Sequence, residues 1–384
     1  MQVNYHSSIN DIPAETWNGL FASDNPFIQH AFLLALEKSG CVNAGTGWQA
    51  QHLTLVDHEQ VLAVMPLFVK HHSYGEFVFD WGWADAYKHH GLNYYPKLVT
   101  AVPFSPVTGP RLGISGQADP DHVLEIVIKA IQHLAVTREC SGWHLLFPDV
   151  QLRKALHQIQ DKDAVLYREA VQFQWRNQDY RNFDEFLAAL KSSRRKTIRR
   201  ERRRVREQGI SLHRKLGAQI SDEEWQNFYQ CYMNTYRKRS GHDGYLNADF
   251  FNRLRKTMTS RLMLVTAQCS EVIIASSLFL YDSHRLYGRY WGALQDVSCL
   301  HFEACFYQGI EFCIEQGLQV FDPGTQGEHK LMRGFAPCKS ISCHWISDGR
   351  FRQAIAEFLE HEKIGTNEYC QRAETYLPYK KEIL

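Results

Sequence analysis

The chain has 384 residues, more than a single hydrophobic core usually holds, so its length predicts two domains. A hydrophobic fraction of 44% and a charged fraction of 22% exclude an intrinsically disordered chain, and no apolar run approaches the ~18 residues of a membrane-spanning helix. The net charge of +1 excludes neither a nucleic acid nor a neutral partner. Its distribution is uneven, because ten basic residues lie between Lys191 and Arg206 against the single acid Glu201.

The N-terminal segment and the cysteines indicate the compartment. The first ten residues lack the basic and apolar regions of a signal peptide, so we expect a soluble, cytoplasmic protein without a membrane span. The ten cysteines are scattered and form no CxxC pair, which predicts reduced thiols. Neither that motif nor HExxH is present, so we expect no metal site.

Two parts of the chain resemble each other at an offset of about 208 to 212 residues. Each has three runs rich in β-branched and aromatic residues, separated by turn residues, and then a fourth block. This pattern predicts three consecutive strands, a loop and a helix in each half. The first set is 53–56, 61–69, 74–85 and 91–95, and the second is 262–265, 272–280, 286–294 and 300–304.

Further elements follow in each half. The first half has a Pro/Gly-rich segment at 103–110, a predicted helix at 121–137 and a predicted strand at 143–147. In the second half, helical spacing ends at Gly317, and strands at 318–321 and 341–346 precede a helix at 350–374. We therefore predict an α/β fold with mixed (α+β) sheets and two domains, residues 1–160 and 161–384.

A basic helix is predicted over residues 183–208. Phe183, Leu187, Leu190, Ile198 and Val205 form one apolar stripe, which Arg194 and Glu201 continue. The other face is cationic and includes Arg195, Arg199 and Arg203, whose i,i+4 spacing makes them repel one another. Phosphates of RNA or of a nucleotide would relieve this repulsion. The alternative is a solvated face neutralised by acids from the rest of the fold.

A Gly-rich loop at 322–335 leaves a predicted strand. Lys330 and Arg333 are three residues apart, so a helical turn would place both cations on one face, beside glycines that allow a ligand to approach the backbone. The loop matches neither GxxxxGK[ST] nor GxGxxG. It is a candidate phosphate site or a plain turn.

The predicted helix start at Leu300 is a third candidate. Free N–H groups and the positive end of the helix dipole favour an anion there. His301 or Glu303 could accept a proton from a nucleophilic amine. The alternative is that Glu303 only complements the dipole and His301 only caps the helix.

Several stretches together resemble a known family. They are residues 25–32, 72–87, 94–98, 102–111, the basic helix, 287–293, 300–303 and 326–331. The sequence is similar to the FemAB-like group of the GNAT acyltransferase superfamily, which is labelled a peptidoglycan biosynthesis or recognition protein.

The resemblance implies two GNAT-like domains in tandem. Fem relatives transfer an amino acid from aminoacyl-tRNA to the amine of a peptidoglycan precursor, whose nucleotide-sugar end is held largely by the first domain. Lys330, before Arg333-Gly334-Phe335, is similar to a phosphate-binding lysine of these relatives, although its spacing is longer. The resemblance does not fix the substrate.

We therefore expect an N-acyltransferase that acts through a ternary complex with acyl-CoA or aminoacyl-tRNA as co-substrate and no permanently bound cofactor. Backbone amides around residues 290–292 would polarise the donor carbonyl. The acceptor is an amine-bearing small molecule or a peptidoglycan-precursor-like amine, and tRNA is a further candidate partner. The candidate acceptor pocket comprises Trp83, Asp85, Tyr94, Tyr287 and Trp291, whose aromatic members have a core role as the alternative. The competing hypothesis is a non-catalytic module that binds a phosphorylated glycan precursor or RNA.

Overall fold

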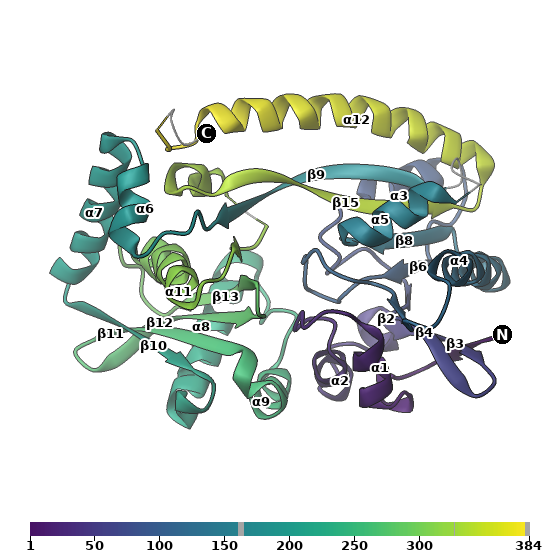
Figure 1. Cartoon of the computed structure of the whole chain (residues 1–384), viewed down its shortest axis with the longest axis horizontal. Coiled ribbons are helices and arrows are strands. Elements are labelled where there is room, and N and C mark those ends of the chain that lie inside the picture. Colours follow the sequence, from purple (N-terminus) through teal and green to yellow (C-terminus); the bar gives the residue numbers. More distant parts are fainter. Residues whose placement is uncertain (160–164, 326, 381–384) are drawn as a thin grey trace. The chain divides into compact units, whose positions relative to one another are not determined.

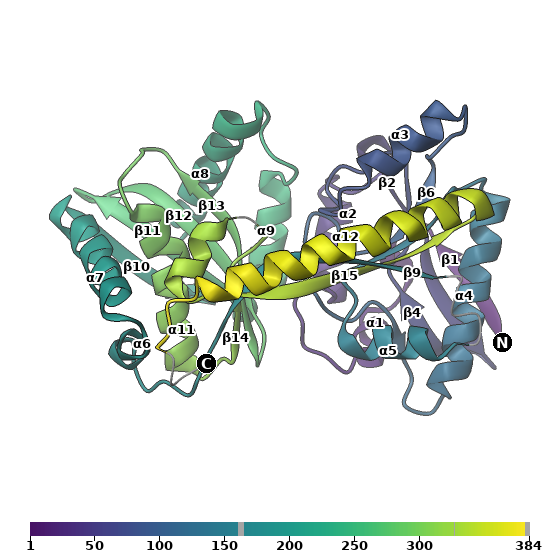
Figure 2. The ribbon, with the colours of Figure 1, turned by 90° about the horizontal axis from the view of Figure 1, so that it is seen from above.

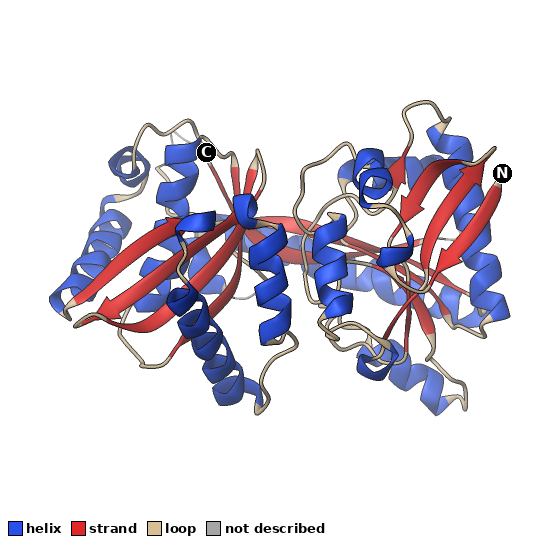
Figure 3. Ribbon diagram, turned by 90° about the horizontal axis from the view of Figure 1, so that it is seen from below, coloured by secondary structure: helices blue, strands red, loops and turns tan. Residues whose placement is uncertain are grey.

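The structure, a computed structural model, describes residues 1–159, 165–325 and 327–380 (Figure 1). The chain divides into two compact units. The first consists of Met1–Ala170 with Lys339–Asn367, and the second of Val171–Cys338 with the residues from Glu368 onward. In each unit, helices lie on both sides of the strands (Figure 3). The α/β class with mixed sheets is thus confirmed.

The first unit contains two groups of strands. Strands β1 (Gln2–His6), β3 (His52–Asp57), β4 (Gln60–Met65) and β7 (Gly113–Ile114) form an antiparallel sheet in the order β1-β3-β4-β7. Strands β15 (Ala336–Ile346), β8 (Gly142–Leu146), β6 (Lys97–Thr100), β5 (Phe68–Lys70) and β2 (Trp48–Ala50) pair in that order, with β6 and β8 parallel.

The helices of the first unit are α1 (Ala14–Leu20), α2 (His30–Lys38), α3 (Trp81–His89), α4 (Pro120–Thr137) and α5 (Val150–Gln158). Helix α4 begins where Asp119 caps its N-terminus and Pro120 takes a position that needs no backbone donor. Its apolar face packs into the core with side chains of β3, β4 and β8. The predicted helix at 121–137 and strand at 143–147 are therefore confirmed.

The second unit is built on one mixed sheet in the order β10-β11-β12-β13-β14-β9. Its strands are β9 (Leu166–Arg176), β10 (Ile210–Leu216), β11 (Leu262–Cys269), β12 (Val272–Tyr281), β13 (Arg285–Ala293) and β14 (Val320–Asp322). Helices α8 (Asp222–Ser240) and α9 (Ala248–Thr257) cover one face of this sheet. On the other face lie α10 (Leu300–Phe302), a π-helical turn (Glu303–Tyr307) and α11 (Gln308–Gln316), as Figures 1 and 2 show.

The internal similarity holds for the first two blocks of each set. Hairpins β3–β4 and β11–β12 both have a bulge and both turn through two left-handed residues, His58 and Glu59 in one and Ser270 and Glu271 in the other. The strand predicted for the third block of the first unit, residues 74–85, was wrong, because residues 81–89 form helix α3. Trp83 and Tyr87, four residues apart, bury one helical face there, so the aromatic run has helical rather than strand periodicity. The fourth block, 91–95, leads into β6 without helix.

The basic helix is also shorter than predicted. Residues 183–208 form two helices, α6 (Phe183–Ala189) and α7 (Ser192–Glu207), because Leu190 and Lys191 adopt extended backbone angles between them. Ile198 and Val205 are the buried side chains of α7, as the stripe predicted. The C-terminal helix is α12 (Gly349–Thr375), in agreement with the sequence.

Candidate functional site

A break in the central sheet of the second unit creates the candidate site. Strands β13 and β14 are parallel and pair only from Arg285 to Tyr287 on β13. β13 continues to Ala293 beyond this short ladder, and a bulge at Arg289 interrupts its register with β12. The Arg289 guanidinium holds the end of β14 through two hydrogen bonds to Asp322, of 2.7 and 3.2 Å. The edge of β13 beyond residue 287 therefore has no strand partner among the described residues on the β14 side.

The helix that follows β13 begins beside this edge. Cys299 caps it in the left-handed conformation, and helical structure then runs without a break from Leu300 to Gln316. The π-helical turn at Glu303–Tyr307 adds a residue to one turn, a distortion that often marks functional sites. The predicted helix start at Leu300 is confirmed.

The Gly-rich loop returns to the same region. Gly324 and Gly327 have φ angles of +91° and +103°, which side chains rarely tolerate, and residues 328–333 form a 3-10 turn. Lys330 is 2% exposed and donates a hydrogen bond of 2.6 Å to the Gly324 carbonyl. Burial lowers the pKa of Lys330 to about 8, with Asp322 opposing the shift and Arg289 adding to it. Gln326, part of the loop in the sequence analysis, lies outside the described residues.

Two histidines meet at the helix start. The rings of His301 and His329 are 5.9 Å apart, and the ring of Trp291 is 5.4 Å from His301. Burial lowers the pKa of His301 to about 3, and His329, Arg239, Lys330 and Arg333 add to the shift. The Nε2 atom of His329 is buried and has no hydrogen-bond partner among the described residues. This corner of the unit is thus apolar enough to oppose charge and is surrounded by cations.

Arg333 is used by the fold instead of being free for a phosphate. Its Nε donates to the Tyr307 hydroxyl (3.0 Å), its Nη1 to the His329 carbonyl (2.8 Å) and its Nη2 to Glu201 (2.6 Å). The guanidinium also stacks over the Phe302 ring, 3.4 Å from its centroid. Arg333 therefore joins α7 to the helix start and to the loop.

Glu303 is likewise engaged. Its two carboxylate oxygens accept 3.0 Å hydrogen bonds from Arg202 of α7, and Gln308 donates a further one of 3.0 Å. Arg202 also pairs with Glu311. This arrangement gives Glu303 a structural role in anchoring α7. The alternative that Glu303 only complements the helix dipole does not include these hydrogen bonds to Arg202.

The outer face of α7 is partly neutralised. Arg199 pairs with Asp184 and Arg203 with Glu207, all on the surface, and both acids belong to the segment 183–208 itself and not to the rest of the fold. Arg195 lies on the same face. Seven cations of the segment have no ion pair among the described residues: Lys191, Arg194, Arg195, Lys196, Arg200, Arg204 and Arg206.

The five predicted acceptor-pocket residues are divided between the two units. Asp85 and Tyr94 line a cavity of 490 Å³ in the first unit, together with Trp81, Lys88 and Asn93. Trp83 is buried and does not line this cavity; its ring lies against that of His344. In the second unit Trp291 lies beside His301, whereas Tyr287 is a core residue whose hydroxyl donates to Asp282. Trp83 and Tyr287 therefore have the core role that was the alternative to a place in the acceptor pocket.

The first unit also contains a buried charge network that sequence reasoning missed. The Lys97 ammonium donates to Asp80 (2.5 Å), Glu76 (2.8 Å) and Ser73 (2.9 Å), and Tyr94 donates to Asp80 (2.6 Å). Burial raises the pKa of Glu76 to about 7 although Lys97 opposes it, while Lys97 holds the pKa of Asp80 low against its own burial. All these residues lie in stretches 72–87 and 94–98, which carry the family resemblance, so that resemblance was the available indication.

Among the described residues, no three His, Cys, Asp or Glu side chains gather where they could hold a metal ion. Within the same residues, no helix combines the length and the apolar composition that crossing a membrane requires.

Comparisons with known proteins identify the family of the chain and solved structures of similar fold. The family model described as FemAB-like, peptidoglycan biosynthesis/recognition, matches residues 8–381. No curated protein matches the chain by sequence. The crystal structure of FemX is 11% identical, with 93% of this chain and 100% of FemX covered and a TM-score of 0.54. A conserved protein of unknown function from Bacteroides thetaiotaomicron is 12% identical, with 90% and 100% covered and a TM-score of 0.55.

A third solved structure has the same fold. It is the C-terminal domain of a putative lysylphosphatidylglycerol synthetase from Agrobacterium fabrum, 9% identical, with 91% of this chain and 95% of that chain covered and a TM-score of 0.51. At such identities the likeness shows the fold alone. It shows that this chain shares the fold of FemX and of this domain over more than nine tenths of its length.

Proposed function

Because the chain belongs to the FemAB-like family, we propose that it is an N-acyltransferase that moves an aminoacyl or acyl group from an activated donor to an amine. The proposal places the donor in the second unit, at the start of the helix that follows β13. It places the acceptor amine against the first unit.

The observation that carries this proposal is the electrostatic character of the helix start. Burial is the main cause that lowers the pKa of His301, and the nearby cations Lys330, Arg333 and Arg239 lower it further, so each of them adds positive potential at this ring. The N-terminal end of a helix adds partial positive charge. A phosphate or pyrophosphate is the ligand that such a site favours, and both aminoacyl-tRNA and acyl-CoA carry phosphates.

We propose His301 as the group that accepts the proton of the acceptor amine. With a pKa near 3, His301 cannot keep a proton at neutral pH before the donor binds. A bound phosphate would cancel part of the cations' contribution and so raise that pKa. The acceptor nitrogen then attacks the donor carbonyl, its proton passes to His301, and the tetrahedral intermediate expels the ribose oxygen or the thiolate, which takes a proton in turn. Glu303 is left out of this step, because both its oxygens are held by Arg202.

The open edge of β13 is the proposed carbonyl-polarising group. Backbone amides on residues 290–292 that do not face β12 have no strand partner there among the described residues. Hydrogen bonds from such fixed amides strengthen as negative charge develops on the carbonyl oxygen.

The 490 Å³ cavity of the first unit is the proposed acceptor site. Asp85 and Lys88 lie one helical turn apart on α3, so one carboxylate and one ammonium face the same space. This pair matches an acceptor that carries both an amine and a carboxylate, as an amino acid or peptide terminus does. Trp81 and Tyr94 supply aromatic surface for the rest of the molecule.

Transfer assays with charged tRNA and with acetyl-CoA, run in parallel over a panel of amines, test the proposal. One donor should be consumed, and His301→Asn should slow its use by about 100-fold or more, as loss of a general base does. His122→Asn, on the exposed face of α4, is the matched control and should leave the rate unchanged. Equal rates for the two variants would remove His301 from the reaction.

One observation favours the non-catalytic alternative, a module that binds RNA or a phosphorylated glycan precursor. The cations on α7 without ion pairs offer a surface for phosphates but no chemistry. If neither donor is consumed and RNA or a nucleotide sugar binds with a steep salt dependence, the alternative replaces the enzyme.

A further inference from the structure

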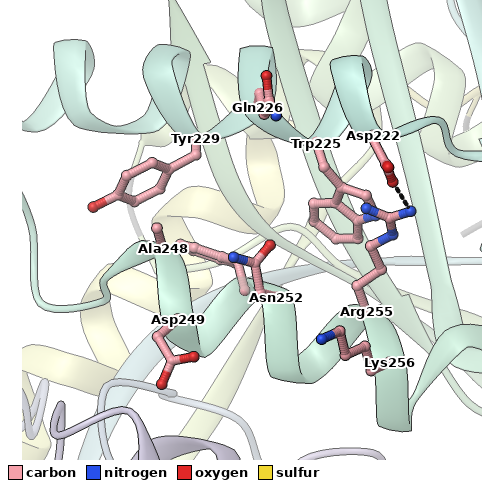
Figure 4. Close-up of a pocket in the computed structure, with 10 residues that line it drawn as sticks. Asp222, Trp225, Gln226, Tyr229, Ala248, Asp249, Asn252, Arg255 and Lys256 are labelled. Atoms are coloured by element: carbon pink, nitrogen blue, oxygen red, sulfur yellow. Dashed lines mark hydrogen bonds and ion pairs between the residues drawn. The ribbon is translucent and has the colours of Figure 1, made fainter.

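A cavity in the second unit lies between helices α8 and α9, and none of its lining residues belongs to the transfer site. Its volume is 570 Å³, within the range of small-molecule sites. Figure 4 shows the Trp225 indole hanging from α8 into the space between the helices, with Asn252 and Arg255 rising from α9 toward it. Tyr229 lies at one end of the cleft, and the ion pair between Asp222 and Arg255 lies at the other.

The floor of the cleft is aromatic and contains an unused donor. Trp225 is 4% exposed and Phe251 is 2% exposed. The indole Nε1 of Trp225 is buried and has no hydrogen-bond partner among the described residues. Buried donors are nearly always paired, because an unpaired one loses its hydration without compensation. An acceptor atom supplied by a ligand would satisfy this N–H.

The rim of the cleft supplies uncommitted polar groups. Gln226, Asn252 and Lys256 line it, and within the described part of the chain none of their side chains has a partner. Asp222, which holds Arg255, is 79% exposed, and exposed ion pairs contribute little to stability. Arg255 can therefore exchange this carboxylate for an anionic group of a ligand, and its movement would open that end of the cleft.

We propose that the α8–α9 cleft binds a nucleotide once Arg255 has released Asp222, with the planar base against the Trp225 ring and the phosphate between Lys256 and Arg255. An acceptor atom of the base would pair with the Trp225 N–H, and Asn252 would read the base or ribose edge. An uncharged sugar would leave Lys256 unused, and a small inorganic anion would leave the aromatic floor and the indole N–H unused. The proposal rests on none of the residues assigned to acyl transfer.

Calorimetric titration of the full chain tests the site. The probes are the four nucleoside monophosphates, the matching nucleosides, ribose 5-phosphate and inorganic phosphate. At least one monophosphate should bind more tightly than both its nucleoside and ribose 5-phosphate. Trp225→Phe keeps the ring and deletes the N–H, so affinity should fall about 3- to 10-fold, as expected for one hydrogen bond.

Lys256→Gln separates the phosphate from the base. It should weaken the monophosphate by about 5-fold or more and leave the nucleoside unchanged, since only the former carries charge. Lys154→Gln, an exposed lysine of α5, is the matched control and should change neither. Circular dichroism of each variant establishes that it is folded.

The proposal is overturned if no monophosphate binds, if inorganic phosphate binds as tightly as the monophosphates, or if Trp225→Phe and Lys256→Gln both bind the monophosphate as the parent does. A nucleotide affinity that is lost in His301→Asn and kept in Lys256→Gln belongs to the transfer site and also refutes it. Failure of acyl transfer alone leaves the cleft measurements unaffected, so the two proposals fail separately.

Discussion

Replacing Lys97 by Met should destabilise the first unit more than any exposed substitution in the protein. Lys97 is fully buried, and the carboxylates of Glu76 and Asp80 that it contacts are 1% and 2% exposed. Methionine fills a similar volume but supplies no charge and no donor. Two carboxylates would then share an apolar site with one oxygen each, Glu76 Oε1 and Asp80 Oδ1, already lacking a partner among the described residues.

The magnitude follows from the loss of one partner in a buried ion pair, which costs about 3–5 kcal/mol in free energy of unfolding. Tyr94→Phe removes only one hydrogen bond, to Asp80, and should cost roughly 1–2 kcal/mol. The Lys97→Met deficit should also depend on pH. Without the ammonium, the pKa values of both carboxyls in the folded state rise above their unfolded values. The variant therefore keeps most stability at low pH and loses it as pH rises from about 4 to 7.

Urea unfolding monitored by hydrogen exchange of β6 and α3 amides measures the stability of this unit separately from the other. Lys154→Met is the control and should lie within about 0.5 kcal/mol of the parent. The triple replacement Lys97→Met, Glu76→Gln, Asp80→Asn should recover part of the loss, because no buried charge remains. A Lys97→Met variant that loses less than about 1 kcal/mol, or whose loss does not vary with pH, refutes the assigned network.

Three more predictions concern the second unit. Lys330 loses its proton near pH 8 when folded and near pH 10.5 when unfolded, so the free energy of unfolding should rise with pH across that window by on the order of 3 kcal/mol. Lys330→Met should abolish this rise when denaturation is measured as a function of pH. If the variant keeps the same slope of stability against pH, the burial effect is contradicted. Gly292→Ala would place a Cβ 2.0 Å from the Cys231 backbone of α8 and should lower the free energy of unfolding by more than about 3 kcal/mol, measured by thermal unfolding. The control Gly82→Ala has nothing within 4 Å of the new Cβ and should be neutral or stabilising by up to ~1 kcal/mol. Similar melting temperatures for the two variants would show that α8 is not held against β13 as described. Glu201→Ala removes the carboxylate shared by Arg333 and Tyr307 and should speed hydrogen exchange in α7, and exchange as slow as in the parent would show that other contacts hold that helix.

Local patterns were sufficient for part of this fold. The hairpins β3–β4 and β11–β12, helix α4 and the helix from Leu300 could be predicted, because alternation, helical spacing and turn residues lie within a few positions of one another. The same rules misassigned residues 81–89. Their aromatic side chains suit a strand or a helix, and burial of Trp83 and Tyr87 on one helical face decides between them.

Sequence alone also determined that cations gather in one segment and that His301, Lys330 and Arg333 belong to candidate phosphate elements. Only the tertiary structure decided which of them are available. Arg333, Glu201 and Tyr307 are more than 100 residues apart at their widest, yet they share one cluster, so Arg333 holds the fold together. Tertiary packing likewise decides that Lys97 meets its carboxylates and that the Trp225 N–H has no partner among the described residues. The residue type states which charge or donor a side chain carries, whereas its partners and its access to water depend on the packing of distant segments.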